Sequence, residues 1–181
     1  MSDVIAVMDS GTLIQQGTPR DIYSRPATAF VATFVGRTNL LPVVKPPPQA
    51  GAGAVSVETS IGPILVTADS NRPIGPADSI VIRPEDLQIS VEAPPAGSSN
   101  VFRGRVRRPV FLGENVELEI DIHGELLVGR QHSRLQFAAG DEIYVQLPVD
   151  RCVIVSGAAA GVGAHIHRTA DEAASDKAAA E

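Results

Sequence analysis

Between residues 55 and 156, apolar and polar positions alternate in short runs that Gly, Pro and Asn interrupt. Alternation with a period of two over about four to eight residues is typical of half-buried strands, because successive side chains point to opposite faces. The pattern predicts strands at 55–59, 63–67, 79–83, 87–91, 101–110, 116–122, 124–130, 143–147 and 152–155. Many short strands separated by turn signals predict a mainly β fold, either a small barrel or a sandwich.

The first 41 residues have a different pattern, which predicts a hairpin followed by helices. The apolar run 4–8 is typical of a strand, 9–11 of a turn and 12–16 of the returning strand. Thr18 is placed to cap a short helix whose first position is Pro19, since proline lacks only an amide that would have no partner there.

A second short helix is predicted after Thr28, which can cap it. Gly36 suits a left-handed residue at the end of this helix. Four large apolar side chains at i, i+1, i+4 and i+5 are expected to share one face, as core or docking contacts: Phe30, Val31, Phe34 and Val35.

Two neighbouring predicted strands, 101–110 and 116–122, place charges of opposite sign on their polar faces. If Val110 faces Val116 in an antiparallel hairpin, the cross-strand pairs are Arg107–Glu119, Arg105–Asp121 and Arg103–His123. Such pairs contribute roughly 0.2–1 kcal/mol each and help to fix the register. The alternative is that the three arginines form a groove for an anion or for nucleic acid.

Composition limits the class of partner. The 181 residues have a net charge of −6, whereas phosphate binding depends on surplus positive charge, so we expect no nucleic-acid partner. The single cysteine, Cys152, cannot form an intramolecular disulfide and fits a reducing compartment. No apolar run approaches the roughly 18 residues that a membrane span needs.

Residues for catalysis and cofactor binding are missing from the sequence. A phosphate-binding loop needs a Gly-Lys pair, and neither Lys45 nor Lys177 follows a glycine. One cysteine excludes the usual zinc spacings, and His165 and His167 lie in an Ala- and Gly-rich tail. Cys152 lies in an apolar run and is expected to be a buried thiol. We therefore expect no catalytic residue, no metal site and no cofactor in this chain.

Several sequence motifs of the chain resemble those of a known family. The chain is similar to the closing stretch of the ATP-binding subunit of an ABC importer at Ser2-Asp3-Val-Ile-Ala-Val-Met8, Gln16-Gly-Thr-Pro19, Phe30-Val-Ala32, Phe34-Val-Gly36 and Asn39-Leu-Leu41. It resembles the transport-associated OB (TOBE) domain of these subunits at Ile80-Val-Ile-Arg-Pro-Glu-Asp-Leu87, Gly104-Arg-Val106, Phe111-Leu-Gly113 and Gly140-Asp-Glu-Ile-Tyr-Val145. Among them it looks most like the spermidine/putrescine group, with the iron and sulfate groups as close neighbours.

The resemblance implies a regulatory and dimerisation module with an OB-like β-barrel. The implied partners are a second copy of the chain, an ABC nucleotide-binding domain and membrane-spanning permease subunits, at the cytoplasmic face of the plasma membrane. ATP and Mg would belong to the full-length family, whose phosphate loop and signature motif precede the stretch matched here. Contact candidates are Phe30, Val31, Phe34, Val35, Arg83 and Glu85. Because relatives of the TOBE domain bind oxyanions, a small-ligand or oxyanion sensor is the alternative.

Four zones are expected along the chain. Residues 1–41 would be the end of a nucleotide-binding domain, and 42–54, rich in Pro, Gly and Ala, a linker. Residues 55–156 would form the TOBE barrel, and 157–181 a disordered Ala- and Gly-rich tail. On this interpretation the chain is a C-terminal piece of a longer subunit, and the face with the phenylalanines is left uncovered.

Overall fold

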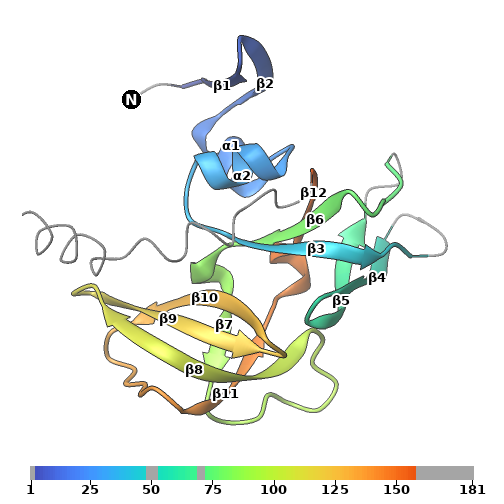
Figure 1. The fold of residues 1–181 in the computed structure, drawn as a ribbon. Coiled ribbons are helices and arrows are strands. Elements are labelled where there is room, and N and C mark those ends of the chain that lie inside the picture. Colours follow the sequence, from blue (N-terminus) through green and yellow to red (C-terminus); the bar gives the residue numbers. More distant parts are fainter. Residues whose placement is uncertain (1–2, 48–52, 69–71, 158–181) are drawn as a thin grey trace, which may run out of the picture.

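The computed structural model of the protein describes residues 3–47, 53–68 and 72–157. It contains β1 (Ile5–Asp9), β2 (Thr12–Gly17), α1 (Pro19–Ser24), α2 (Ala29–Phe34), β3 (Asn39–Lys45), β4 (Gly53–Thr59), β5 (Gly62–Ala68), β6 (Asp78–Ile82), η1 (Pro84–Asp86), β7 (Gln88–Ser90), β8 (Val101–Phe111), β9 (Asn115–Ile122), β10 (Glu125–His132), β11 (Glu142–Gln146), η2 (Val149–Arg151) and β12 (Val153–Ser156). The helices lie between the β1–β2 hairpin and the sheet that contains β3 and β6 (Figure 1).

Two curled antiparallel sheets of five strands form the larger part of the molecule, with orders β12-β6-β3-β4-β5 and β10-β9-β8-β11-β7. We call residues 39–157, as far as they are described, the barrel, and residues 3–38 the N-terminal segment. All nine strands predicted from the alternation are present as β4 to β12, with ends that shift by one or two residues. The predicted mainly β fold is therefore confirmed.

Two hairpins use the same tight turn. Ser10 and Gly11 connect β1 to β2 with φ of 47° and 82°, and His123 and Gly124 connect β9 to β10 with φ of 54° and 91°. A two-residue loop with positive φ at both positions matches the right-handed twist of the strands that it joins. Glycine at the second position removes the steric cost of that backbone conformation.

The predicted linker 42–54 is wrong at both ends. Strand β3 includes residues 42–45 and pairs with β6 and β4, and β4 already begins at Gly53. The proline cluster hid the alternation in which Leu41 and Val43 point into the core. Pro42 is tolerated because the β6 ladder ends there and the β4 ladder starts at the next residue. The barrel thus starts at Asn39, inside the zone expected to be a nucleotide-binding remnant; 48–52 and the expected tail beyond Gly157 lie outside the described residues.

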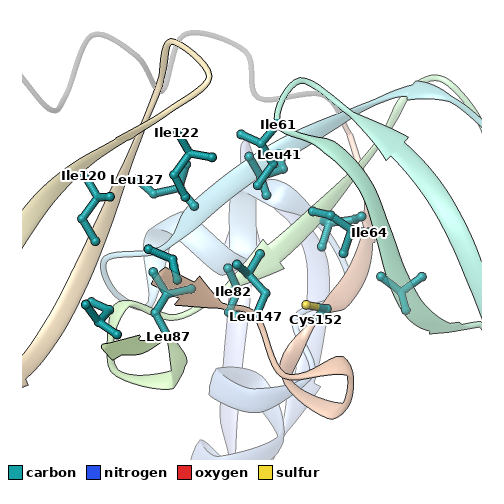
Figure 2. Packing of buried hydrophobic residues seen from close by; sticks show 14 of the residues in the cluster. Leu41, Ile61, Ile64, Ile82, Leu87, Ile120, Ile122, Leu127, Leu147 and Cys152 are labelled. Carbon is teal, nitrogen blue, oxygen red and sulfur yellow. The ribbon is translucent and has the colours of Figure 1, made fainter. Parts of the chain in front are cut away.

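One hydrophobic core fills the space between the two sheets (Figure 2). Ile120, Ile122 and Leu127 of one sheet pack toward Leu41 and Ile64 of the other, and all five are at most 2% exposed. Within one of the sheets, Gly104 of β8 leaves room for a core side chain of β9, since a Cβ at this position would lie 2.7 Å from Cγ2 of Ile120. Such dense packing makes the barrel sensitive to the volume of each core side chain.

Two buried asparagines join the sheets where no backbone ladder connects them. The Asn39 amide donates to the Val128 carbonyl at 2.9 Å and accepts from the Val128 amide at 2.7 Å, which ties β3 to β10. Asn100 accepts from the Leu65 amide at 2.7 Å and donates to the carbonyls of Leu65 and Leu147 at 2.8 and 3.0 Å. Each side chain thus replaces a strand neighbour for backbone groups that would otherwise be unpaired.

Candidate functional site

Both helices of the N-terminal segment start at the predicted caps. The Thr18 hydroxyl accepts from the Asp21 amide at 3.1 Å, and the Thr28 hydroxyl accepts from the Val31 amide at 3.2 Å. The predicted left-handed Gly36 is wrong, because helix α2 ends with Val35 in a right-handed conformation and Gly36 has no positive φ.

Gly36 instead leaves room for two side chains that meet above it. A Cβ at this position would lie 3.3 Å from Cε2 of Tyr23 and 3.7 Å from Nη1 of Arg83. The glycine therefore permits a close approach between the end of α2 and the side chain of Arg83.

Arg83 connects the barrel to both helices. It follows strand β6, is 4% exposed, and its guanidinium lies 4.1 Å from the centre of the Tyr23 ring. Nη2 donates to the Tyr23 carbonyl in the last turn of α1 at 3.1 Å. Nη1 reaches three carbonyls at and after the end of α2: Ala32 at 2.9 Å, Gly36 at 3.1 Å and Arg37 at 3.2 Å.

The contact forms because the carbonyl groups at the ends of the two helices need hydrogen-bond donors. The last carbonyls of a helix have no partner within the helix, and a cation at that end is also favoured by the helix dipole. A guanidinium supplies several donors in one plane, so a single side chain can satisfy carbonyls of two helices. Burial lowers the pKa of Arg83, but arginine stays charged at neutral pH. Its Nε atom is buried without a hydrogen-bond partner.

A ring of charged groups surrounds this contact. The Tyr23 hydroxyl donates to Glu85, and Arg130 of β10 lies 3.7 Å from Glu85 and 2.6 Å from Glu117. Arg37, just after α2, also pairs with Glu117, which is only 7% exposed. Burial and the hydrogen bond to Glu85 raise the pKa of Tyr23. Arg83 and Glu85, both predicted contact residues, thus lie at the junction between the barrel and the N-terminal segment.

The four apolar contact candidates on α2 do not share one face. Phe30 and Phe34 stack at 5.8 Å between ring centres and are 39% and 68% exposed. Val31 is fully buried, and the half-buried Val35 packs against the same small cluster, which includes Ile22 of α1. The expectation of a single face was wrong because, at 3.6 residues per turn, neighbouring positions point about 100° apart. Of these four candidates, only Phe30 and Phe34 are exposed.

The hairpin β1–β2 adds further exposed apolar side chains. Val7 is buried against the helices, but four others are 36–56% exposed: Val4, Ile5, Met8 and Leu13. A two-stranded sheet is marginal without further packing. The N-terminal segment therefore leaves several large apolar side chains uncovered beside its own small core.

The predicted pairing of charges along β8 and β9 is partly wrong. Arg105 does lie opposite Asp121, but the register shifts between Val106 and Arg108. Beyond the shift Arg108 faces Glu119, and Arg107 binds Asp121 with Nε at 3.0 Å. The same bulge places Val116 opposite Phe111 instead of Val110. Consecutive arginines satisfy the acidic strand in either register, so the charge pattern could not reveal the bulge.

Arg103, expected opposite His123, lies beside strand β11 instead. Its guanidinium lies 5.6 Å from the centre of the Tyr144 ring. Together with Arg105, these two residues line a surface groove of about 490 Å³ whose wall also contains Asp121 and Glu142. Two arginines and two carboxylates balance one another, so the groove has no surplus positive charge for an anion.

Other candidate chemistry is not assembled in the described residues. Cys152 is 5% exposed, and burial raises the pKa of its thiol to about 12, so it is a buried hydrophobic group as predicted. Within residues 3–47, 53–68 and 72–157, no cluster of three His, Cys, Asp or Glu side chains could hold a metal ion. No helix in that part of the chain is long and apolar enough to cross a membrane.

Comparison with known proteins places this geometry in context. Residues 80–155 match the TOBE domain family. The chain is 35% identical over 161 residues to the spermidine/putrescine import ATP-binding protein PotA of Treponema pallidum (strain Nichols), which covers 80% of this chain and 42% of that protein. It is also 35% identical over 133 residues to the Fe(3+) ions import ATP-binding protein FbpC of Brucella suis biovar 1 (strain 1330). That alignment covers 71% of this chain and 34% of FbpC.

A solved structure supports the fold. The cytoplasmic molybdate-binding protein ModG superposes with a TM-score of 0.52 over 66% of this chain and 95% of that chain, at 13% identity. The chain spans less than half the length of the two import proteins. The resemblance to the C-terminal region of ABC importer ATP-binding subunits is confirmed, and the OB-like character of the barrel with it.

Proposed function

We propose that this chain is a non-catalytic module that docks on a nucleotide-binding domain. The chain is similar to the ATP-binding subunits of ABC importers and contains their TOBE domain. In this proposal it also helps to hold two ATP-binding subunits together. The observation that supports this most is the geometry of α2. One side of the helix is fixed to the barrel through Arg83, while Phe30 and Phe34 stack in solvent on another side. A held helix with an exposed aromatic pair is suited to dock on a partner.

The occupant proposed for this surface is the nucleotide-binding domain of an importer ATP-binding subunit. Exposed apolar patches with polar surroundings mark interaction sites in soluble proteins. The β1–β2 hairpin also has exposed apolar residues, and it would gain stability from neighbouring strands of a partner sheet.

The role proposed for the barrel is to raise the local concentration of the ATPase halves. When modules are linked to a second contact, each later encounter becomes intramolecular, and overall affinity rises without new chemistry. A second copy of the chain and the membrane-spanning permease complete the proposed assembly at the cytoplasmic face of the membrane. ATP and Mg would be bound by the nucleotide-binding domain. Polyamines are the proposed solute class, with iron as the alternative that the second group of relatives raises.

A small-ligand or oxyanion sensor is the competing function, and no contact among the residues that the structure describes favours it. The groove beside Arg103 and Arg105 is balanced by Asp121 and Glu142. Calorimetric titration with molybdate, sulfate and spermidine separates the two functions. The docking function predicts no saturable heat with any of the three, whereas a sensor predicts saturable binding of one of them.

The direct test is binding of this chain to a separately produced nucleotide-binding domain of an importer ATP-binding subunit, followed by sedimentation velocity. We expect a complex with the wild-type chain and at least a tenfold weaker one with the double variant Phe30→Ser/Phe34→Ser. The matched control is Phe111→Ser/Leu112→Ser, which removes two exposed apolar side chains from the barrel and should bind normally. No complex with the wild-type chain, or equal loss in both variants, would refute docking through α2.

A further inference from the structure

We propose that Arg83 and the charged ring around it form a coupling joint, which locks the N-terminal segment to the barrel in one orientation and so transmits movement between them. The joint itself is a property of this chain alone. That the movement comes from a docked nucleotide-binding domain is the one part that rests on the proposed function.

Apolar packing between the helices and the barrel uses small side chains on the helix side. The buried cluster at this contact contains Ala29 and Ala32 of α2 with Val81 and Val155 of the sheet, and the half-buried Leu40 and Val153 of the barrel pack against it. Alanine side chains bury one methyl group each and present no shape that resists sliding. The backbone adds one contact at the edge, where Ser156 donates to the carbonyl of Ala27. Directional contacts must therefore supply what the packing lacks.

The Arg83 guanidinium supplies that direction. Its donors lie in one plane and reach the Tyr23 carbonyl of α1 and the Ala32 carbonyl of α2 at the same time. A rotation of either helix relative to β6 breaks at least one of these hydrogen bonds, because the fork is rigid. A buried carbonyl that loses its donor is costly, so intermediate orientations are disfavoured.

The charged ring makes the joint two-sided. From the N-terminal segment it receives Tyr23 of α1 and Arg37 beyond α2, and from the barrel Glu85, Glu117 and Arg130. Glu117 is 7% exposed and pairs with an arginine from each side. Moving the segment away would leave this buried carboxylate with one partner fewer, which is strongly unfavourable.

The alternative is that Arg83 only adds stability, like any buried polar residue. The two accounts differ in what Arg83→Lys does. Lysine keeps the positive charge but offers a point donor in place of the planar fork. A purely stabilising role predicts lower stability with an unchanged arrangement, whereas the joint predicts a loosened orientation in a barrel that stays folded.

The experiment measures the distance between spin labels on the two regions of the intact chain. The labels are placed by Arg20→Cys on α1 and Glu125→Cys on β10, both exposed positions. The native Cys152 is buried, and the raised pKa of its thiol disfavours the reactive thiolate, so labelling at the two introduced cysteines is favoured. We expect one narrow distance distribution in the labelled parent chain and a distribution at least twice as broad after Arg83→Lys.

The control Arg107→Lys changes an arginine that pairs only within the barrel, and it should leave the distribution narrow. Hydrogen exchange on the same variants is the second readout. In Arg83→Lys we expect at least tenfold faster exchange of amides 29–36, with those of β8 to β10 within twofold of wild type. An unchanged distance distribution, or equal acceleration in both regions, would overturn the joint. Because no partner is present, either result is independent of whether the chain docks on a nucleotide-binding domain.

Discussion

The barrel and the N-terminal segment bury their apolar residues to very different extents. The barrel packs two sheets around one continuous core. The N-terminal segment buries three apolar side chains in a cluster of its own, Val7, Ile22 and Val31. Seven of its large apolar side chains are exposed, against six in the much longer barrel, among the residues that the structure describes. The segment therefore depends more on what it contacts than the barrel does.

This difference separates a scaffold from an interaction element. Regions with few buried contacts open most easily, and binding elements are drawn from them. The N-terminal segment gains order from Arg83 on one side, and we propose that it gains the rest from a partner on the other. Variants that disturb each region separately test whether the barrel and the N-terminal segment differ in this way.

The largest effect is expected from a cavity in the barrel. Ile120→Ala removes a fully buried side chain between the two sheets and should lower the free energy of unfolding by about 2–5 kcal/mol, measured by urea denaturation. Ile22→Ala is the matched variant in the N-terminal segment. It should speed hydrogen exchange in α1 and α2 while the barrel transition keeps its midpoint. If the barrel and the N-terminal segment of Ile22→Ala lost stability together, the two regions would be one cooperative unit.

The next effect is expected at the seam between the sheets. Asn39→Ala leaves the buried amide and carbonyl of Val128 without these hydrogen-bond partners. Each unpaired group lowers the free energy of unfolding by about 1–3 kcal/mol. We expect the barrel to lose about 2–4 kcal/mol, measured by thermal and urea unfolding. The control Asn115→Ala, at a half-buried position of β9, should change stability by less than about 0.5 kcal/mol. Equal losses in both variants would argue against a special role for the seam.

A smaller effect is expected from the joint. Tyr23→Phe removes the hydroxyl that donates to Glu85 and should cost about 1 kcal/mol at neutral pH. The folded state raises the pKa of Tyr23, chiefly through burial, so this contribution is complete below the unfolded pKa near 10.0 and is lost as the pH rises through the folded value. The difference in melting temperature between wild type and variant should therefore shrink above pH 10. A difference that grows there contradicts the contact.

The smallest perturbation uses the native thiol as a reporter of the barrel. Because burial raises the pKa of the Cys152 thiol to about 12, its thiolate fraction at pH 8 is far lower than in the unfolded chain. Reaction with a thiol-specific disulfide reagent should be correspondingly slow, and it should stay slow in Ile22→Ala. Fast labelling of that variant would show that loosening the N-terminal segment opens the barrel.

Local patterns in the sequence predict most of the fold, because period-2 alternation and helix caps act over a few residues. They identified β4 to β12, the first hairpin and the caps at Thr18 and Thr28. They missed β3, since Pro42 and the prolines that follow the strand mask the alternation of Leu41 and Val43. They also missed the bulge after Val106, because the arginines on both sides of it fit the same acidic strand.

The junction could not be derived from spacing. Arg83 contacts carbonyls that lie 46 to 60 positions away in the sequence, and any residue type presents a carbonyl. Only the family resemblance around Arg83 and Glu85 marked them as contact residues. A signal that could have helped is Gly36, whose lack of a side chain makes room for Tyr23 and Arg83, although it resembles an ordinary helix end.

Hydrogen exchange of the chain with and without an importer nucleotide-binding domain is the most direct measurement. If the N-terminal segment is the docking element, the partner should raise protection from exchange in β1, β2 and α2, and protection in β8 to β10 should not change. Protection confined to β8 to β10, or none anywhere at saturating partner, would contradict the division of the molecule into a self-sufficient barrel and a segment completed by its partner.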